Sequence, residues 1–68
     1  MMFSKDTTIR NSETLYLAMT KTCQYTFNEL QGKSNLNDTE LCLAIGQLMQ
    51  EGRLIQMKNT DGIYYSVA

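Results

Sequence analysis

Two helix-capping signals lie close together in the middle of the chain, and they constrain its fold more than any other feature. Thr26 is followed three residues later by Glu29, and Asn37 is followed at the same spacing by Glu40. A Thr or Asn with Glu three positions on forms a capping box, in which each side chain binds the backbone N–H of the other residue. The pattern predicts two helix starts that are separated by one short helix and a tight turn.

The helix that starts at Asn37 has the clearest pattern, and we expect it to occupy most of the stretch 36–53. Its apolar residues recur at helical spacing and form one face: Leu41, Ala44, Ile45 and Leu48. Gly52 follows the last of them, at the position where a left-handed glycine commonly closes a helix.

The remaining segments predict a first helix before this pair and a hairpin after it. The first helix should be capped by Asp6 and run to about Lys21. Its buried face should carry Ile9, Ser12, Tyr16 and Met19, with Leu15 at the edge. The stretch 22–25 favours an extended strand, and the helix capped by Thr26 should cover 27–33.

After Gly52 the helical period disappears. Residues 54–58 and 63–67 predict two strands, and the Asp-Gly pair between them predicts a hairpin turn. The order of elements is that of an α+β winged helix-turn-helix domain, with three helices and a C-terminal β-hairpin as the wing. We assign residues 6–68 to this domain and residues 1–5 to a flexible N-terminal arm. The expected core is Ile9, Tyr16, Met19, Phe27, Leu30, Leu36, Leu41, Ala44, Ile45, Leu48, Leu54 and Ile63.

These motifs resemble a small bacterial winged helix-turn-helix family whose biochemical role is not established. The matching segments are FNEL at 27–30, LNDTEL at 36–41, AIGQL at 44–48 and EGRL at 51–54, together with the hairpin. The first helix matches less closely, because Glu13, Thr14 and Leu17 stand where small residues and a tryptophan are expected. The resemblance implies a stand-alone domain that self-associates, and we therefore expect a homodimer.

The charge of the chain bears on DNA binding, which this fold commonly performs. A DNA-binding domain is typically basic, because Lys and Arg neutralise phosphates, whereas this chain has a net charge of −1. The third helix would enter the major groove with its outward face, which comprises Thr39, Leu43, Gly46, Gln47 and Gln50. Gln47 and Gln50 suit adenine edges. The expected phosphate contacts are Lys33, Arg53 and Lys58. A DNA-binding regulator is the alternative function.

The same outward face favours a protein partner. An exposed Leu43 beside Gly46 forms a shallow apolar surface, and a glycine within a helix costs about 1 kcal/mol relative to alanine. Either a side chain of the same domain fills the space at Gly46, or a second backbone packs there, from the arm at 1–3 or from another subunit. The leading hypothesis is a protein-interaction or homodimerisation module that uses this face and the N-terminal arm.

Catalytic and metal-binding motifs are missing from the sequence. The chain has no histidine, so it has no Ser-His or Cys-His pair, and it has no glycine-rich phosphate loop. Cys23 and Cys42 do not form a zinc-ligand pattern and are expected to be reduced, partly buried thiols. We expect a non-enzymatic, cytoplasmic protein with no cofactor, no metal, no small-molecule ligand and no membrane segment.

Overall fold

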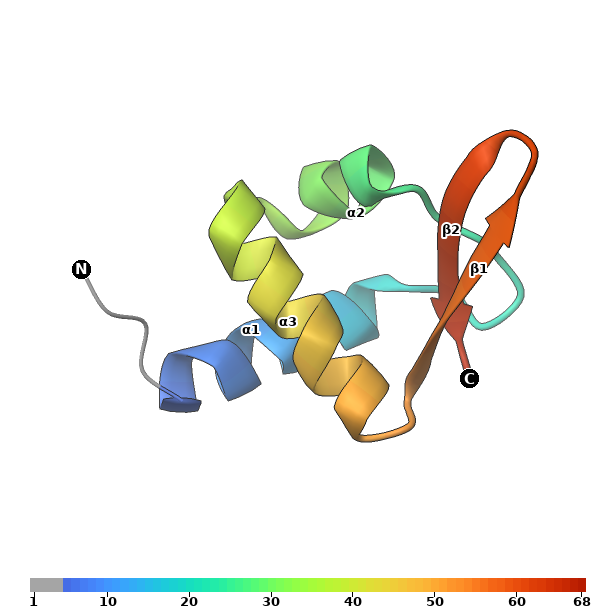
Figure 1. Ribbon diagram of the computed structural model, residues 1–68. Helices are drawn as coiled ribbons and strands as arrows, with labels where there is room; N and C mark the ends of the chain where they lie inside the picture. The colour runs from blue at the N-terminus through green and yellow to red at the C-terminus, as the bar shows by residue number, and fades with distance from the viewer. Residues whose placement is uncertain (1–4) are drawn as a thin grey trace.

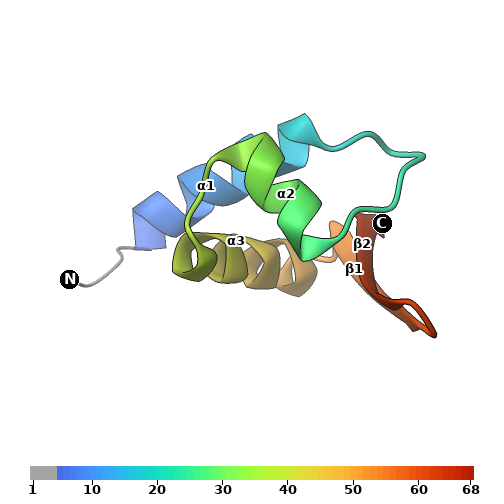
Figure 2. The same ribbon diagram turned by 90° about the horizontal axis from the view of Figure 1, so that it is seen from above.

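The computed structural model describes residues 5–68 and contains three helices followed by a β-hairpin. The elements are α1 (Lys5–Ala18), α2 (Phe27–Ser34), α3 (Asp38–Gln50), β1 (Leu54–Asn59) and β2 (Gly62–Val67). This order confirms the predicted α+β winged helix-turn-helix arrangement. Helix α1 packs mainly against α3, and α2 lies across both (Figure 1). The tip of the hairpin projects away from the helices (Figure 2).

Both predicted capping boxes are present. Thr26 Oγ1 accepts the Glu29 N–H at 3.2 Å, and the Glu29 carboxylate accepts the Thr26 N–H at 2.8 Å. Asn37 Oδ1 accepts the Glu40 N–H at 2.8 Å, and the Glu40 carboxylate accepts the Asn37 N–H at 3.0 Å. These bonds satisfy backbone donors that have no partner inside the helix, and they set where α2 and α3 begin.

The turns that end the two helices use the left-handed backbone region. Asn35 has φ 60° and closes α2 with a hydrogen bond from its N–H to the carbonyl of Gln31. Gly52 has φ 74° and follows α3, as its position in the sequence predicted. Asparagine and glycine adopt this conformation more easily than other residues. The chain therefore reverses between α2 and α3 and again between α3 and the hairpin.

The core lies between the three helices and the base of the hairpin. Its buried hydrophobic residues are Leu15, Met19, Tyr25, Leu30, Leu41, Ala44, Ile45, Leu48 and Leu54. Half-buried residues surround them: Tyr16, Phe27, Leu36, Tyr65 and Val67. Most of the predicted core is thus confirmed, including the whole apolar face of α3.

Two predicted core residues are exposed instead, and one predicted edge residue is buried. The buried face of α1 is centred on Leu15 and Ser12, both fully buried. Ile9 lies about 90° around the helix from this centre and keeps 38 % of its surface exposed. Ile63 is 43 % exposed, and it is the second residue of β2, directly after the hairpin turn. The predicted N-terminal arm, 1–5, falls outside the described residues except for Lys5, with which α1 begins. Asp6, which was predicted to cap this helix, therefore lies inside its first turn.

The segment between α1 and α2 differs from its prediction. Helix α1 ends at Ala18 rather than near Lys21, and the predicted strand at 22–25 is reduced to one bridge between Tyr25 and Tyr65. Each of these tyrosines donates its N–H to the carbonyl of the other, at 2.8 and 2.7 Å. The chain turns directly after α1 so that Tyr25 reaches β2. Tyr25 also accepts the Thr20 N–H through its hydroxyl at 2.9 Å, which holds the turn.

Candidate functional site

The predicted outward face of α3 is on the surface of the domain. It lies opposite the buried residues Leu41, Ala44, Ile45 and Leu48. Four of its members are exposed: Thr39, Leu43, Gly46 and Gln50. Gln47 is half-buried, and its amide donates to a carboxylate oxygen of Glu51 at 2.9 Å. Gln47 is therefore less available to a partner than the other four residues.

Gly46 lies in the middle of α3 and faces open space. A Cβ added to it would meet no atom of residues 5–68 within 4 Å, apart from its own stretch of helix backbone. Within the part of the chain that the structure describes, the glycine therefore does not make room for a side chain of its own domain. An alanine would stabilise an isolated helix by about 1 kcal/mol at such a position. Nothing in the packing of residues 5–68 requires glycine there.

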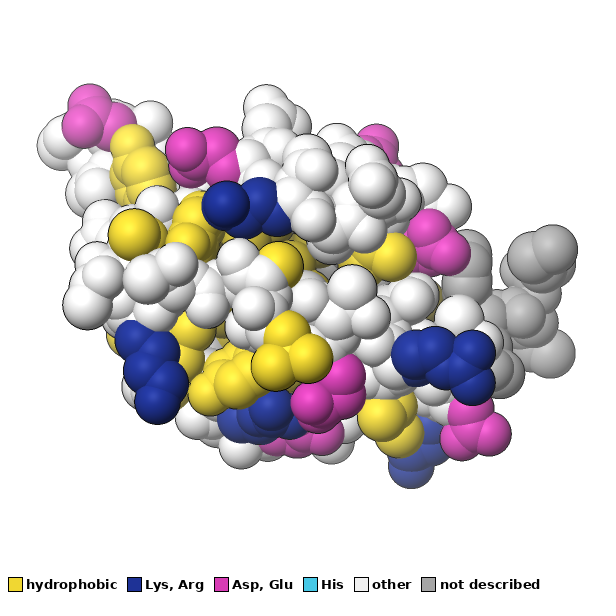
Figure 3. Space-filling view, turned by 180° about the vertical axis from the view of Figure 1, so that it is seen from behind, with side chains coloured by type: hydrophobic (Ala, Val, Ile, Leu, Met, Phe, Trp, Pro, Cys, Tyr) yellow, Lys and Arg dark blue, Asp and Glu magenta, His cyan; other side chains and the backbone are white. Residues whose placement is uncertain are grey.

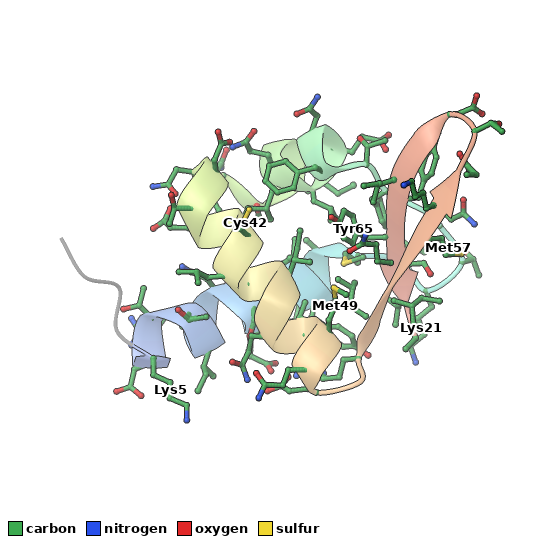
Figure 4. The ribbon with its side chains drawn as sticks, viewed as in Figure 1. Lys5, Lys21, Cys42, Met49, Met57 and Tyr65 are labelled. Atoms are coloured by element: carbon green, nitrogen blue, oxygen red, sulfur yellow. The ribbon has the colours of Figure 1, made fainter. Side chains whose placement is uncertain are left out.

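Large apolar side chains lie one turn to either side of Gly46. Leu43 is 41 % exposed and Met49 is 39 % exposed. Met49 lies on the side of α3 that faces the hairpin, and Cys42 lies in the N-terminal half of the helix (Figure 4). The surface formed by Cys42, Leu43, Gly46 and Met49 is named here the α3 patch. It combines exposed apolar area with one position where a neighbour can approach the backbone closely.

Two members of this patch, Cys42 and Met49, are not among the residues predicted for the outward face of the helix. Cys42 and Cys23 were expected to be partly buried, and both are exposed free thiols. Helical spacing would have placed both Cys42 and Met49 on the same face as Gly46, because Cys42 lies four residues before it and Met49 lies three residues after it.

Arg53, one of the three predicted phosphate contacts, is engaged within the domain. Its guanidinium lies 4.0 Å from the centroid of the Tyr16 ring. It also donates to the carboxylates of Glu13 and Glu51. The hydrogen bond from Arg53 lowers the pKa of the Glu13 carboxyl below its ordinary value of 4.5, and the same pair raises the pKa of Arg53. This charge is already paired with acidic groups of its own chain.

The other two predicted phosphate contacts belong to different elements. Lys33 lies in α2 with its ammonium 5.5 Å from the centroid of the Tyr25 ring, and Lys58 is exposed on β1. On the face opposite to that of Figure 1, the Lys and Arg side chains are spread out and do not gather in one stretch (Figure 3). Helix α3 itself begins with Asp38 and is followed by Glu51. The described residues thus give α3 acidic ends and no basic groove.

The described residues contain no cluster of three or more potential metal-ligating His, Cys, Asp or Glu side chains, and they enclose no pocket. None of the helices in residues 5–68 is long and apolar enough to cross a membrane.

Comparisons with family models, with curated proteins and with solved structures find no match to this chain. The fold assignment therefore rests on the arrangement of the helices and the hairpin. The resemblance to a small bacterial winged-helix family remains a prediction from the sequence.

Proposed function

We propose that this domain is a non-enzymatic protein-interaction module that forms a homodimer through the outward face of α3. The observation that carries the proposal is the open space at Gly46, with exposed Leu43 and Met49 one turn to either side. A glycine lets a second backbone approach, and the leucine and methionine supply apolar area to bury. The N-terminal arm, which lies outside the described residues, would add to this contact.

A second copy of the chain is the partner that the surface fits best. A two-fold axis through Gly46 would cross two α3 helices at their glycines, where no side chain separates them. Each Leu43 and Met49 would then lie against the partner helix. A domain of 68 residues has a small core, so it gains a large share of its stability from additional buried area.

The test is the solution mass over a concentration series for three proteins. The wild type should show a concentration-dependent dimer. Leu43→Asp should be a folded monomer, because an aspartate carboxylate would be desolvated against the partner helix. Leu17→Asp is the matched control, since Leu17 is 79 % exposed on α1 and lies outside the α3 patch.

Two results would contradict the proposal. One is a wild-type protein that stays monomeric at high micromolar concentration. The other is a dimer that Leu17→Asp dissociates and Leu43→Asp leaves intact, which would move the interface to α1. Circular dichroism of each variant checks that the protein is folded under the conditions in which its solution mass is measured.

DNA binding remains the second candidate, and the observation in its favour is the fold itself. A helix-turn-helix followed by a wing presents α3 to a major groove, with Gln50 exposed for base contacts and Lys33 and Lys58 for phosphates. Because few Lys and Arg side chains are available to phosphates, the affinity for DNA should be weak and should depend only slightly on salt concentration. Titration of mixed-sequence duplex DNA at low salt tests this function. Binding that Lys58→Ala weakens and Leu17→Asp leaves unchanged would support it over the homodimer.

A cytoplasmic location is part of the same proposal. Cys23 and Cys42 are both exposed and unpaired, and such thiols remain reduced in a reducing compartment. The bacterial origin follows only from the resemblance described above. Alkylation of the protein in freshly lysed cells would show whether both thiols are free.

A further inference from the structure

Strand β1 has one edge that pairs with β2 and a second edge that points away from it. The direction of its backbone groups follows from the register of the sheet. On β2, the N–H and C=O of Tyr65 bond to Tyr25, on the side away from β1. Tyr65 therefore forms a pair without hydrogen bonds with the residue opposite it on β1, which is Gln56. The N–H and C=O of Gln56 must then point outward from β1.

The end of the ladder agrees with this alternation. The Ala68 N–H donates to the Arg53 carbonyl at 3.0 Å, so the carbonyl of Arg53 points toward the end of β2. Because hydrogen-bonded pairs alternate with pairs that lack such bonds, Ile55 and Met57 bond to β2, whereas Gln56 and Lys58 do not. No residue from 5 to 68 supplies a hydrogen-bond partner for the outward groups of Gln56 and Lys58.

This edge lacks the features that usually prevent a sheet from extending. Protected edges commonly contain proline, a β-bulge or several charges. The sequence of β1 is LIQMKN, with no proline and one charge, and its pairing with β2 is continuous from Leu54 to Asn59. Gln56 and Lys58 are both exposed. Gln56 and Lys58 together offer an added strand two outward N–H and two outward C=O groups at regular spacing.

The side chains of β1 define what an added strand should contain. Ile55 and Met57 share one face of the sheet, and Ile55 is 46 % exposed. Met57 lies on the side of the hairpin away from the Tyr65 ring, beside the segment that contains Gln24 (Figure 4). Gln56 and Lys58 share the other face, and Lys58 has no ion-pair partner among residues 5–68. Complementary side chains would be apolar on the first face and acidic on the second.

We propose that the free edge of β1 binds an extended peptide segment of a partner protein, with alternating apolar and acidic residues, by β-strand addition. Main-chain hydrogen bonds to Gln56 and Lys58 would hold the segment, and a carboxylate beside Lys58 would select it. A second copy of β1 fits less well, because LIQMKN contains no carboxylate to pair with Lys58. The site is separate from the α3 patch and does not depend on the proposed homodimer.

The test uses a capped peptide of alternating valine and glutamate as the probe, with a valine and lysine peptide as its control. Amide hydrogen exchange is followed by NMR. Without the probe, the amides of Ile55 and Met57 should be protected, and those of Gln56 and Lys58 should exchange rapidly. With the glutamate peptide, the Gln56 and Lys58 amides should become protected. The lysine peptide should protect them less.

Proline substitution provides a matched pair of variants. Gln56→Pro removes an N–H that points outward, so the protein should stay folded while affinity for the probe falls about tenfold or more. Met57→Pro removes an N–H that bonds to β2 and should destabilise the hairpin instead. Lys58→Glu should reverse the preference between the glutamate and lysine peptides.

Three outcomes would overturn the proposal. The first is that millimolar glutamate peptide leaves the exchange of Gln56 and Lys58 unchanged. The second is that Gln56→Pro binds the peptide as tightly as the wild type. The third is protection of both amides that grows with protein concentration in the absence of the probe, since this would make a second copy the occupant. Leu43→Asp should bind the peptide like the wild type. This variant therefore distinguishes a failure of the proposed peptide binding at β1 from a failure of the proposed homodimer at the α3 patch.

Discussion

The guanidinium of Arg53 lies over the ring of Tyr16, 4.0 Å from its centroid, and so connects the residue before β1 to α1. The backbone of Arg53 is held as well, because its N–H donates to the Leu48 carbonyl at 2.9 Å. A planar guanidinium can stack on an aromatic ring and still bind a carboxylate at its edge, here that of Glu13. Arg53 therefore fixes the direction in which the hairpin leaves α3.

The ion pair between Arg53 and Glu13 predicts a pH-dependent contribution to stability. The pKa of Glu13 is lower in the folded protein than its ordinary value of 4.5, because Arg53 donates a hydrogen bond to the charged form. A lowered pKa stabilises the fold above the unfolded-state pKa, and this contribution disappears as the pH falls through the folded-state pKa. Glu13→Gln should thus be less stable than the wild type at pH 7. The difference should shrink as the pH falls below 4.5 and through the lowered pKa of Glu13, which urea denaturation at several pH values would measure.

Because Glu13 is exposed, this effect should be small and sensitive to salt. A stability difference that stays constant from pH 7 to pH 3 would show that Glu13→Gln acts through something other than the ion pair.

Alanine at Gly46 should have opposite effects on stability and on association. Gly46→Ala should raise the free energy of unfolding of the monomer by about 1 kcal/mol, since the helix gains propensity and the Cβ meets nothing. The same Cβ would hold two α3 helices apart and weaken the homodimer. Gly32→Ala is the matched control, because Gly32 also faces open space within a helix but lies in α2. It should stabilise the monomer and leave the solution mass unchanged.

If both alanine variants change association to the same extent, Gly46 does not lie in the dimer interface. The stability measurements belong in the Leu43→Asp background, where dimerisation does not contribute to the free energy of unfolding.

Two leucines of α1 should respond very differently to truncation. Leu15 is fully buried, and Leu15→Ala should lower the free energy of unfolding by about 2–5 kcal/mol through lost burial and a cavity. Leu17 is 79 % exposed, and Leu17→Ala should change it by no more than about 0.5 kcal/mol. Denaturant titration of the two variants checks the orientation of α1. Similar losses at both positions would mean that the helix is rotated from the orientation described here.

The hydroxyl of Tyr25 should contribute to the turn after α1. Tyr25→Phe keeps the buried ring but leaves the Thr20 N–H without its acceptor, so the free energy of unfolding should fall by about 1 kcal/mol. Tyr64→Phe is the control, since the hydroxyl of Tyr64 makes no hydrogen bond within the part of the chain that the structure describes. Thermal unfolding would detect the difference. Equal melting temperatures for both variants would contradict this role of Tyr25.

The sequence by itself determined the starts of α2 and α3, the turns that follow these two helices and the apolar face of α3, because these depend on residues that are near neighbours along the chain. Capping boxes act over three residues, and a left-handed turn depends mainly on the residue that adopts it. Thr26 with Glu29, and Asn37 with Glu40, needed no distant contact to be recognised. The same holds for Leu41, Ala44, Ile45 and Leu48, whose helical spacing defines which side of α3 is buried.

Only the tertiary structure decided the features that depend on distant partners. Helical spacing alone was compatible with a buried face of α1 that includes Ile9. Packing against α3 instead buries the face that is centred on Leu15. The sequence alone allowed Arg53 to be a phosphate contact. In the fold, its guanidinium instead contacts Glu13 and Tyr16. The free edge of β1 follows from a single bridge between Tyr25 and Tyr65. Each of these outcomes arises from an encounter between segments far apart in the chain, which local spacing does not encode.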